Sequence, residues 1–322
     1  MQPPATGAGG AGREGSFPPP PSQKPAVVED LVASLERRRS YREVTLSLRS
    51  GLRDAKAEFS FLRHRGLKNL LRFLQSSASA SDDSIRLFRH SQSVPDLQGF
   101  LECDSPVLRL TVESLGQKPV VPVLFQNTLR PSKVEDPVVD LDRVFGVEPM
   151  KISSPATDGE VCLALRVLEG CCLLGGESKV LAHRYNAISV LMNILSTRGI
   201  LEQGACLDAL ISLLLDCSAN QTDFEACHSI EKIAEILKDE HRDENIRLKC
   251  AEFLLLLIGH VNGREKPPMA TIYEDINRLL GEKSASLIWA ASQFGSTLDP
   301  EQRQTALHIQ ARRVMESLDF ID

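Results

Sequence analysis

The sequence repeats itself with a period of 42 residues, and this period constrains the fold more than any other feature. The nine residues "AISVLMNIL" from Ala187 superpose without a gap on "SIEKIAEIL" from Ser229, and "GLKNLLRFL" from Gly66 follows the same pattern. Three twelve-residue segments also correspond to one another: "LALRVLEGCCLL" from Leu163, "ACLDALISLLLD" from Ala205 and "KCAEFLLLLIGH" from Lys249. The first two precede the windows that begin at Ala187 and Ser229. Helical repeats of about 40–47 residues are typical of armadillo and HEAT arrays, whose units stack because none can bury its apolar face alone. We therefore predict an all-α protein, an armadillo/HEAT-like α-solenoid with a disordered N-terminus and a long irregular insertion.

Composition and periodicity divide the 322 residues into five parts. Residues 1–25 form a Gly/Ala/Pro-rich tail that cannot pack a core and is expected to be disordered. Helical periodicity then predicts N-terminal helices and a first repeat element over 26–75, armadillo-like repeats over 158–262, and C-terminal helices over 263–322. The last helix, near 299–318, has Asp299 as its expected N-cap and Pro300 at its first position. Residues 76–157 are expected to be a partly disordered insertion, in which "VVPVLF" is either a strand or a docked extended segment.

Charge and hydropathy favour protein partners in a reducing compartment. The formal net charge is −6, yet residues 24–75 hold twelve Lys/Arg and only six Asp/Glu, so the rest of the chain is acidic. A basic part on an acidic body suggests protein partners more than nucleic acid. The longest apolar run, "FLLLLIG" from Phe253, is far shorter than the ~20 residues of a membrane span. With no secretory signal, we expect a cytoplasmic protein whose eight cysteines are reduced.

The stretch "LEGCCLLGGESK" from Leu168 contains the residue types of nucleophiles and phosphate loops. In the repeat register, however, Cys171 and Cys172 take the places of Leu213 and Leu214, which makes them small core residues. Gly175 follows where a C-cap glycine is expected. The spacing matches neither C-x-x-C nor a P-loop, so we interpret the stretch as a helix end.

Other chemical patterns are weak, and we expect no enzyme activity, no cofactor and no metal site. Cys103 and Arg109 fit the C-x5-R of phosphatase loops, but acidic residues flank the cysteine and no glycine lies between. The seven histidines show neither H-x3-H nor H-E-x-x-H spacing. A nucleic-acid surface at "LERRRSYR" (35–42) would need interleaved aromatics, so a solvated helix face is the better interpretation.

Residues 158–262 resemble the cell division control protein fourteen family, the septation initiation network component rather than the phosphatase of that name. The similarity is carried by the "L-x-G-x-x-L-L" helix before "ES", by "ACLDAL" followed by "LLLDCSANQTDFE", and by "IRLKCAEFL". The resemblance implies a non-catalytic adaptor that supports a germinal-centre (Ste20-like) protein kinase in cytokinesis signalling, with placement at spindle poles or microtubule-organising structures. Three alternatives stay open: an armadillo scaffold for an unrelated protein or peptide, a phosphatase that uses Cys103, and a nucleic-acid binder.

Two candidate binding features follow from the pattern. In the three nine-residue windows, positions two, five, six and nine are apolar and expected in the core, while positions three and seven point outward. If the windows stack in order, they form a partner-binding ladder from basic to acidic, with an exposed apolar contact at Val190: Lys68, Arg72, Ser189, Val190, Asn193, Glu231 and Glu235. Separately, Ser93 has Arg89 before it and Pro95 after it, and its phosphorylation would create a loose docking motif for 14-3-3 proteins.

Overall fold

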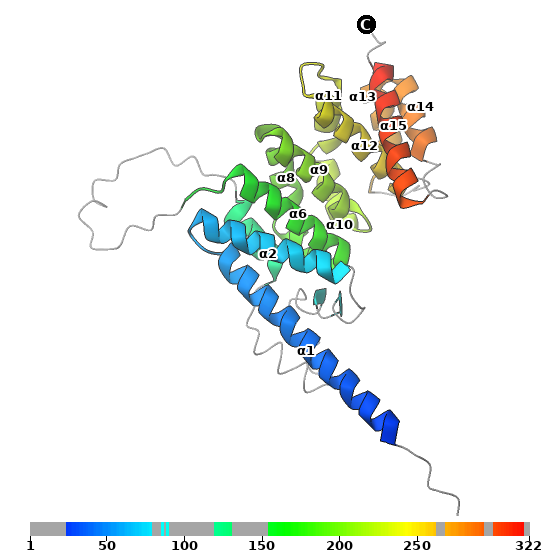
Figure 1. Cartoon of the computed structure of the whole chain (residues 1–322). Helices are drawn as coiled ribbons and strands as arrows, with labels where there is room; N and C mark the ends of the chain where they lie inside the picture. The colour runs from blue at the N-terminus through cyan, green and yellow to red at the C-terminus, as the bar shows by residue number, and fades with distance from the viewer. Residues whose placement is uncertain are drawn as a thin grey trace, which may run out of the picture. The chain divides into compact units, whose positions relative to one another are not determined.

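A computed structural model describes residues 24–78, 85–86, 88–89, 119–130, 154–261, 268–292 and 299–318. Most of the expected disordered tail and most of the expected insertion lie outside these residues; Lys24 and Pro25, which the prediction assigns to the tail, are helical. The chain divides into two compact units, residues 1–40 and 41–322, which are described separately. Throughout the described ranges every regular element is helical, as the periodicity predicts (Figure 1).

Helix α1 (Lys24–Ala55) begins in the first unit and ends in the second. Its first-unit part exposes Leu31, Val32 and Leu35. In the second unit, α1 meets α2 (Ser60–Ala78) at two glycines. A Cβ on Gly66 would lie 2.3 Å from the backbone nitrogen of Ala55, and one on Gly51 would lie 2.8 Å from Leu70. The two helices can approach this closely only because both positions lack a side chain.

The second unit then repeats a short, a medium and a long helix three times. The first set is α7 (Gly176–Arg184), α8 (Ala187–Thr197) and α9 (Ile200–Leu214). The second is α10 (Ser218–Ala226), α11 (Ser229–Lys238) and α12 (Glu244–Val261). The third is α13 (Ile272–Leu280), α14 (Glu282–Ser292) and α15 (Pro300–Leu318). Another long helix, α6 (Asp158–Leu174), precedes them.

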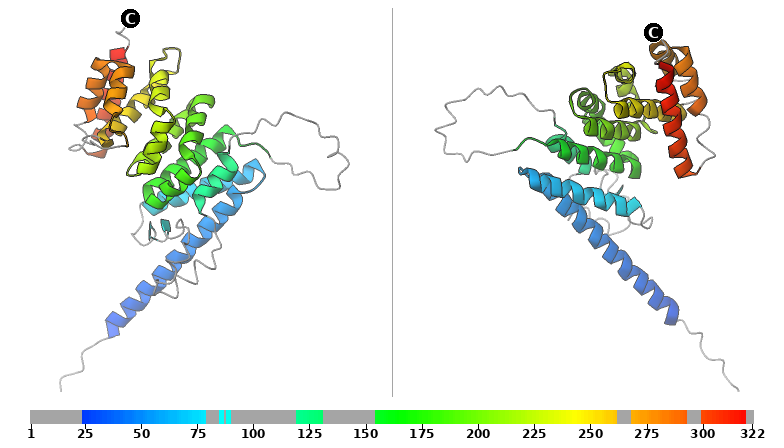
Figure 2. Two further views of the ribbon diagram at one scale, coloured as in Figure 1. Left: turned by 180° about the vertical axis from the view of Figure 1, so that it is seen from behind. Right: turned by 45° about the horizontal axis from the view of Figure 1, so that its top comes forward.

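The long helices pack side by side in the order α2, α6, α9, α12 and α15 (Figure 2). Each medium helix packs on the long helix of its own set: α8 on α9, α11 on α12 and α14 on α15. Two turns show the period in the backbone: Asn186 and His228, 42 residues apart, both adopt the left-handed conformation before a medium helix. Asn and His are among the residue types that tolerate this conformation.

One expected element is wrong. "VVPVLF" is neither a strand nor extended, because Val120–Val123 form helix α5 and Leu124–Thr128 continue as a π-helix, η2. Pro122 lies in the first turn, where its missing N–H breaks no hydrogen bond. The segment is buried, packs on α6 and α7, and stacks Phe125 on Tyr185 with 6.0 Å between ring centroids.

The last helix, α15, begins one residue after its expected start and ends at the expected residue. Asp299 Oδ1 accepts a hydrogen bond from the Gln302 N–H at 2.9 Å, which confirms the expected N-cap. The buried apolar side chains form one continuous cluster, to which almost every described helix contributes. No helix in the described ranges is both long enough and apolar enough to cross a membrane.

Candidate functional site

A surface groove with an apolar lining lies along the row of long helices, between α9, α12 and α15. It has a cavity volume of about 670 Å³. Its walls are mostly apolar, and its apolar side chains come from three long helices and the end of α14: Leu207, Ile211, Phe253, Leu255, Leu256, Ala291, Ala306 and Leu307. Leu256 is 45% exposed, although most leucines of α12 are buried. Concave apolar surfaces with a few polar groups are the usual form of binding sites.

Charged side chains line the same groove and neutralise one another. Lys249 Nζ lies 3.3 Å from Asp208 Oδ1 and 3.4 Å from Glu252 Oε2, and His308 Nδ1 lies 3.3 Å from the other Glu252 oxygen. Partial burial works to lower the pKa of Lys249, but the two carboxylates outweigh it and raise that pKa above its usual value. The lysine is therefore held in its charged form between two helices.

The charges continue onto α6 with the period of the repeat. Arg166, Asp208 and Lys249 are 42 and 41 residues apart and alternate in sign along α6, α9 and α12. Glu169, beside them, has a raised pKa because burial disfavours its charged form and Asp208 repels it. The row of long helices therefore carries alternating charges beside an apolar groove, a surface suited to binding a polypeptide.

The residues predicted as a partner-binding ladder are not brought together on this surface. Lys68 and Arg72 lie on the long helix α2, whereas Ser189 and Asn193 lie on α8, one of the medium helices. Glu231 and Glu235 lie on α11, where Glu231 makes an ion pair of 3.5 Å with Arg278. The apolar pattern of one helix face is the same in both layers, so the nine-residue match could not tell a long helix from a medium one.

Burial in the three windows follows the expected pattern, with one correction. Positions two, five, six and nine are buried, apart from the half-buried Leu71, and the predicted outward residues are exposed or, for Glu231, half-buried. Val190 was expected to be an exposed apolar contact. It is half-buried and packs against the core.

The cysteine-rich stretch is a helix end, as predicted. Leu165, Leu168, Cys171 and Cys172 are at most 2% exposed. Burial raises the pKa of both thiols, that of Cys172 to about 12, so neither is a ready nucleophile. Gly175 is the C-cap of α6, as expected; its backbone is extended, and it joins α6 to α7.

Cys103, Arg109 and Ser93 lie outside the described residues. His183 Nδ1 lies 2.6 Å from Asp223 Oδ2, a pair that links the equivalent helices α7 and α10. Within the described ranges no group of three His, Cys, Asp or Glu side chains could hold a metal ion.

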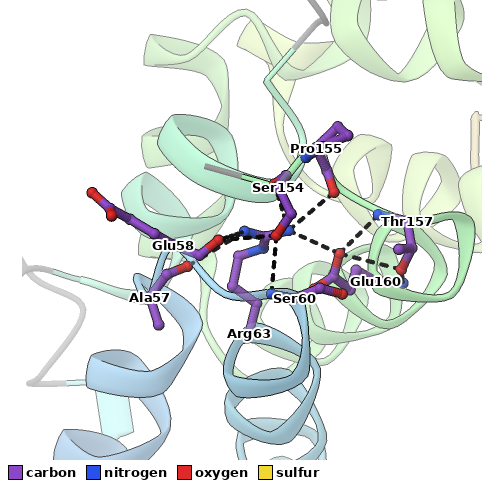
Figure 3. Close-up of polar contacts among 8 residues, drawn as sticks. All are labelled: Ala57, Glu58, Ser60, Arg63, Ser154, Pro155, Thr157 and Glu160. Carbon is purple, nitrogen blue, oxygen red and sulfur yellow. Dashed lines mark hydrogen bonds and ion pairs between the residues drawn. The ribbon is translucent and has the colours of Figure 1, made fainter. Parts of the chain in front are cut away.

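A buried ion pair that the sequence analysis missed fixes the corner between α1 and α2 (Figure 3). Arg63 Nη2 lies 3.2 Å from Glu160 Oε2 and donates to the carbonyls of Ser154 and Pro155 at 2.9 and 3.1 Å. Its Nη1 donates to the Glu58 carbonyl at 2.7 Å. Glu160 in turn belongs to the capping box of α6, in which its carboxylate accepts from the Thr157 N–H at 2.8 Å.

One half of this network was visible in the sequence. "TDGE" at 157–160 fits the capping box S/T-x-x-E. Its partner Arg63 lies 97 residues away, and no local signal joins the two. The arrangement holds helices together and leaves no open space for a substrate, since both side chains are buried.

Comparison with known proteins gives one family. Residues 139–290 match the family model described as "Cell division control protein 14, SIN component". Over these residues, slightly less than half of the chain, the sequence is similar to the cell division control protein 14 family. The match supports a role in cell division. The matched region is longer than the 158–262 of the sequence resemblance: it begins 19 residues earlier and ends 28 residues later. It includes the helices from α6 to most of α14.

The remaining comparisons add nothing on function. No curated protein matches the chain. One solved structure that matches is an engineered protein from the Northeast Structural Genomics Consortium, with 11% sequence identity and a TM-score of 0.41, covering 84% of this chain and 96% of that one. A similarity at this level carries no conclusion. Of the groove, the α9 and α12 walls lie inside the cell division control protein 14 match, whereas α15 lies outside it.

Proposed function

We propose that this protein is a non-catalytic, armadillo-like adaptor that binds a germinal-centre (Ste20-like) protein kinase in cell-division signalling. The observation that carries the proposal is the groove between α9, α12 and α15, with its apolar lining and paired charges. The three short–medium–long helix sets support a solenoid, in which such a surface is shared by successive units.

The match to the family model supports a setting in cell division. A member acting with a kinase in cell division would work in the cytoplasm and at spindle poles or microtubule-organising structures. Binding of 14-3-3 proteins to phosphorylated Ser93 belongs to the same proposal. A phosphopeptide spanning 86–98 tests that point directly, and no measurable 14-3-3 affinity would remove it.

The groove is tested with a charge placed on its wall. Leu256→Glu puts a carboxylate into the apolar lining, and Leu201→Glu is the matched control, since Leu201 is 76% exposed on α9 and does not line the groove. Affinity purification followed by mass spectrometry should recover the kinase with the wild type and the control but not with Leu256→Glu, all three melting within a few degrees.

Other outcomes discriminate the alternatives. Recovery of a different protein that Leu256→Glu also loses would indicate an armadillo scaffold for an unrelated partner. Loss of the kinase with Arg72→Glu and Glu235→Arg combined, and not with Leu256→Glu, would place binding on the residues of the predicted ladder. Phosphatase activity abolished by Cys103→Ser would contradict the non-catalytic proposal.

A further inference from the structure

The corner between α1 and α2 exposes two aromatic side chains. Phe59 is 57% and Phe61 68% exposed, and their ring centroids lie 6.5 Å apart. Phenylalanines with this much surface in water are costly, and such groups often mark interaction sites. The corner lies outside the region that matches the cell division control protein 14 family.

These rings are held outward by a rigid support. Arg63 donates to the carbonyl of Glu58, in the corner, and to the carbonyl of Ser154, in the chain that enters α6, and so ties the two segments together. The Ser60 N–H donates to Ser154 Oγ at 3.2 Å, so the backbone between the two rings is also fixed (Figure 3). A pre-ordered surface loses little entropy on binding.

A basic stripe runs from Phe61 along the outward face of α2. Arg65, Lys68 and Arg72 follow Phe61 at spacings of four, three and four, which places all four on one side of the helix. All four are exposed, and α2 contains no Asp or Glu. The nearest buried carboxylate, Asp54, is already bound by Arg65 at 2.8 Å and by Arg53 at 3.2 Å.

We infer that this surface, the aromatic–basic face of Phe59, Phe61, Arg65, Lys68 and Arg72, binds an acidic segment of a partner protein that carries apolar residues at one end. The apolar end would cover the two rings, and the carboxylates would follow the cations down α2. The stripe from Phe61 to Arg72 is about 16 Å long, which an extended peptide of about five residues spans.

An acidic peptide fits this surface better than other anionic partners. If the two rings inserted into an anionic bilayer, the lipid headgroups would repel the Glu58 carboxylate, which is exposed beside Phe59. Single-stranded nucleic acid needs open aromatic faces for stacking, whereas the two rings lie close to each other with 36° between their planes.

The test uses the full-length protein and a fluorescein-labelled octapeptide, Phe-Leu followed by six alternating Asp and Glu residues. Fluorescence anisotropy should show binding that falls at least tenfold in Lys68→Glu/Arg72→Glu and at least fivefold in Phe61→Ser. The matched control Arg184→Glu/Lys232→Glu reverses two exposed cations on α7 and α11 and should bind as the wild type does. A second peptide, with Ser-Gly in place of Phe-Leu, should bind at least fivefold more weakly to the wild type.

Several results would overturn the inference. Equal binding of both peptides, or no effect of Phe61→Ser, would mean that only non-specific charge attraction acts. Absence of peptide binding to the wild type would also overturn it, and binding instead to phosphatidylserine vesicles or to poly(U) would identify a membrane or nucleic-acid surface. Kinase recovery from the groove experiment is a separate measurement, so this surface and the proposed function can fail independently.

Discussion

At the scale of single residues, the Arg63–Glu160 ion pair is the interaction that fixes the corner between α1 and α2. Both side chains are buried, and Arg63 Nε and Glu160 Oε1 find no hydrogen-bond partner in the described structure. A buried ion pair is seldom a net gain over apolar residues of similar volume, but removing one partner leaves a costly unpaired charge. Its value here is that it selects one arrangement of the corner, the entry segment and the α6 cap.

The first prediction concerns Glu160 and pH. Burial works to raise the pKa of this carboxyl, but the Thr157 N–H and Arg63 outweigh it, so the folded-state pKa lies below the ordinary 4.5. A carboxyl with a lowered pKa stabilises the fold above its unfolded pKa, and this contribution is lost as the pH falls below about 4.5. The free energy of unfolding in urea, measured from pH 6 to pH 3, should therefore fall less steeply in Glu160→Gln than in the wild type.

Glu58→Gln is the matched control for this measurement, because Glu58 is exposed in the same corner. Its pH dependence should follow the wild-type curve. Superimposable curves for the wild type and Glu160→Gln would show that the pair contributes nothing to acid stability.

At the scale of elements, the helices and their period could be predicted from the sequence. Whether a given helix belongs to the row of long helices or is one of the medium helices could not. An apolar residue every three or four positions reports that one face of a helix is buried, and it is the same for α2, α8 and α11. Position in the stack depends instead on contacts between distant segments, such as Gly66 against Ala55 or Arg63 against Glu160. The helical form of 120–123 was missed for a related reason, because a short Val-rich run is ambiguous until its burial is known.

The second prediction contrasts two helical glycines. Gly66→Ala should destabilise the protein by about 2 kcal/mol or more, because the new Cβ would lie 2.3 Å from the Ala55 nitrogen and the α1–α2 contact must open. Gly204→Ala in α9 meets no atom within 4 Å and should stabilise by about 0.5–1 kcal/mol, the usual gain of helix propensity. Chemical unfolding measures both. A destabilised Gly204→Ala, or a neutral Gly66→Ala, would mean that the helix packing differs from that described.

At the scale of the whole second unit, the architecture is a row in which each long helix contacts its neighbours. Candidate binding surfaces in such a row arise where equivalent positions of successive helices adjoin, as Asp208 and Lys249 do. The sequence contains those positions at spacings of 42 and 41, yet only the packing order shows that they, and not the medium helices, border a groove. In the proposed solenoid, stability would be transmitted from neighbour to neighbour.

The last prediction uses buried cysteines as reporters of that transmission. Cys171 and Cys172 lie in α6, Cys206 in α9 near the middle of the row, and Cys250 in α12. Burial raises the pKa of each of these thiols, to about 12 for Cys172 and Cys250, so alkylation at pH 8 requires local opening. In urea below the unfolding transition, Cys206 should be alkylated most slowly, because α9 is the middle helix of the row, farthest from both ends, and the Cys206 Sγ also donates to the Leu191 carbonyl at 3.0 Å.

The substitution Arg63→Ala tests whether opening at the α2 end of the row stays local. It removes the link between α2 and α6, so it should speed alkylation of Cys171 and Cys172 several-fold while leaving Cys250, at the far side of α9, nearly unchanged. Mass spectrometry of peptides after timed iodoacetamide pulses measures each site, with fully unfolded protein giving the intrinsic rates. If all four thiols reacted at one rate, and Arg63→Ala accelerated them equally, the second unit would open as a single cooperative body and the proposed solenoid would be wrong.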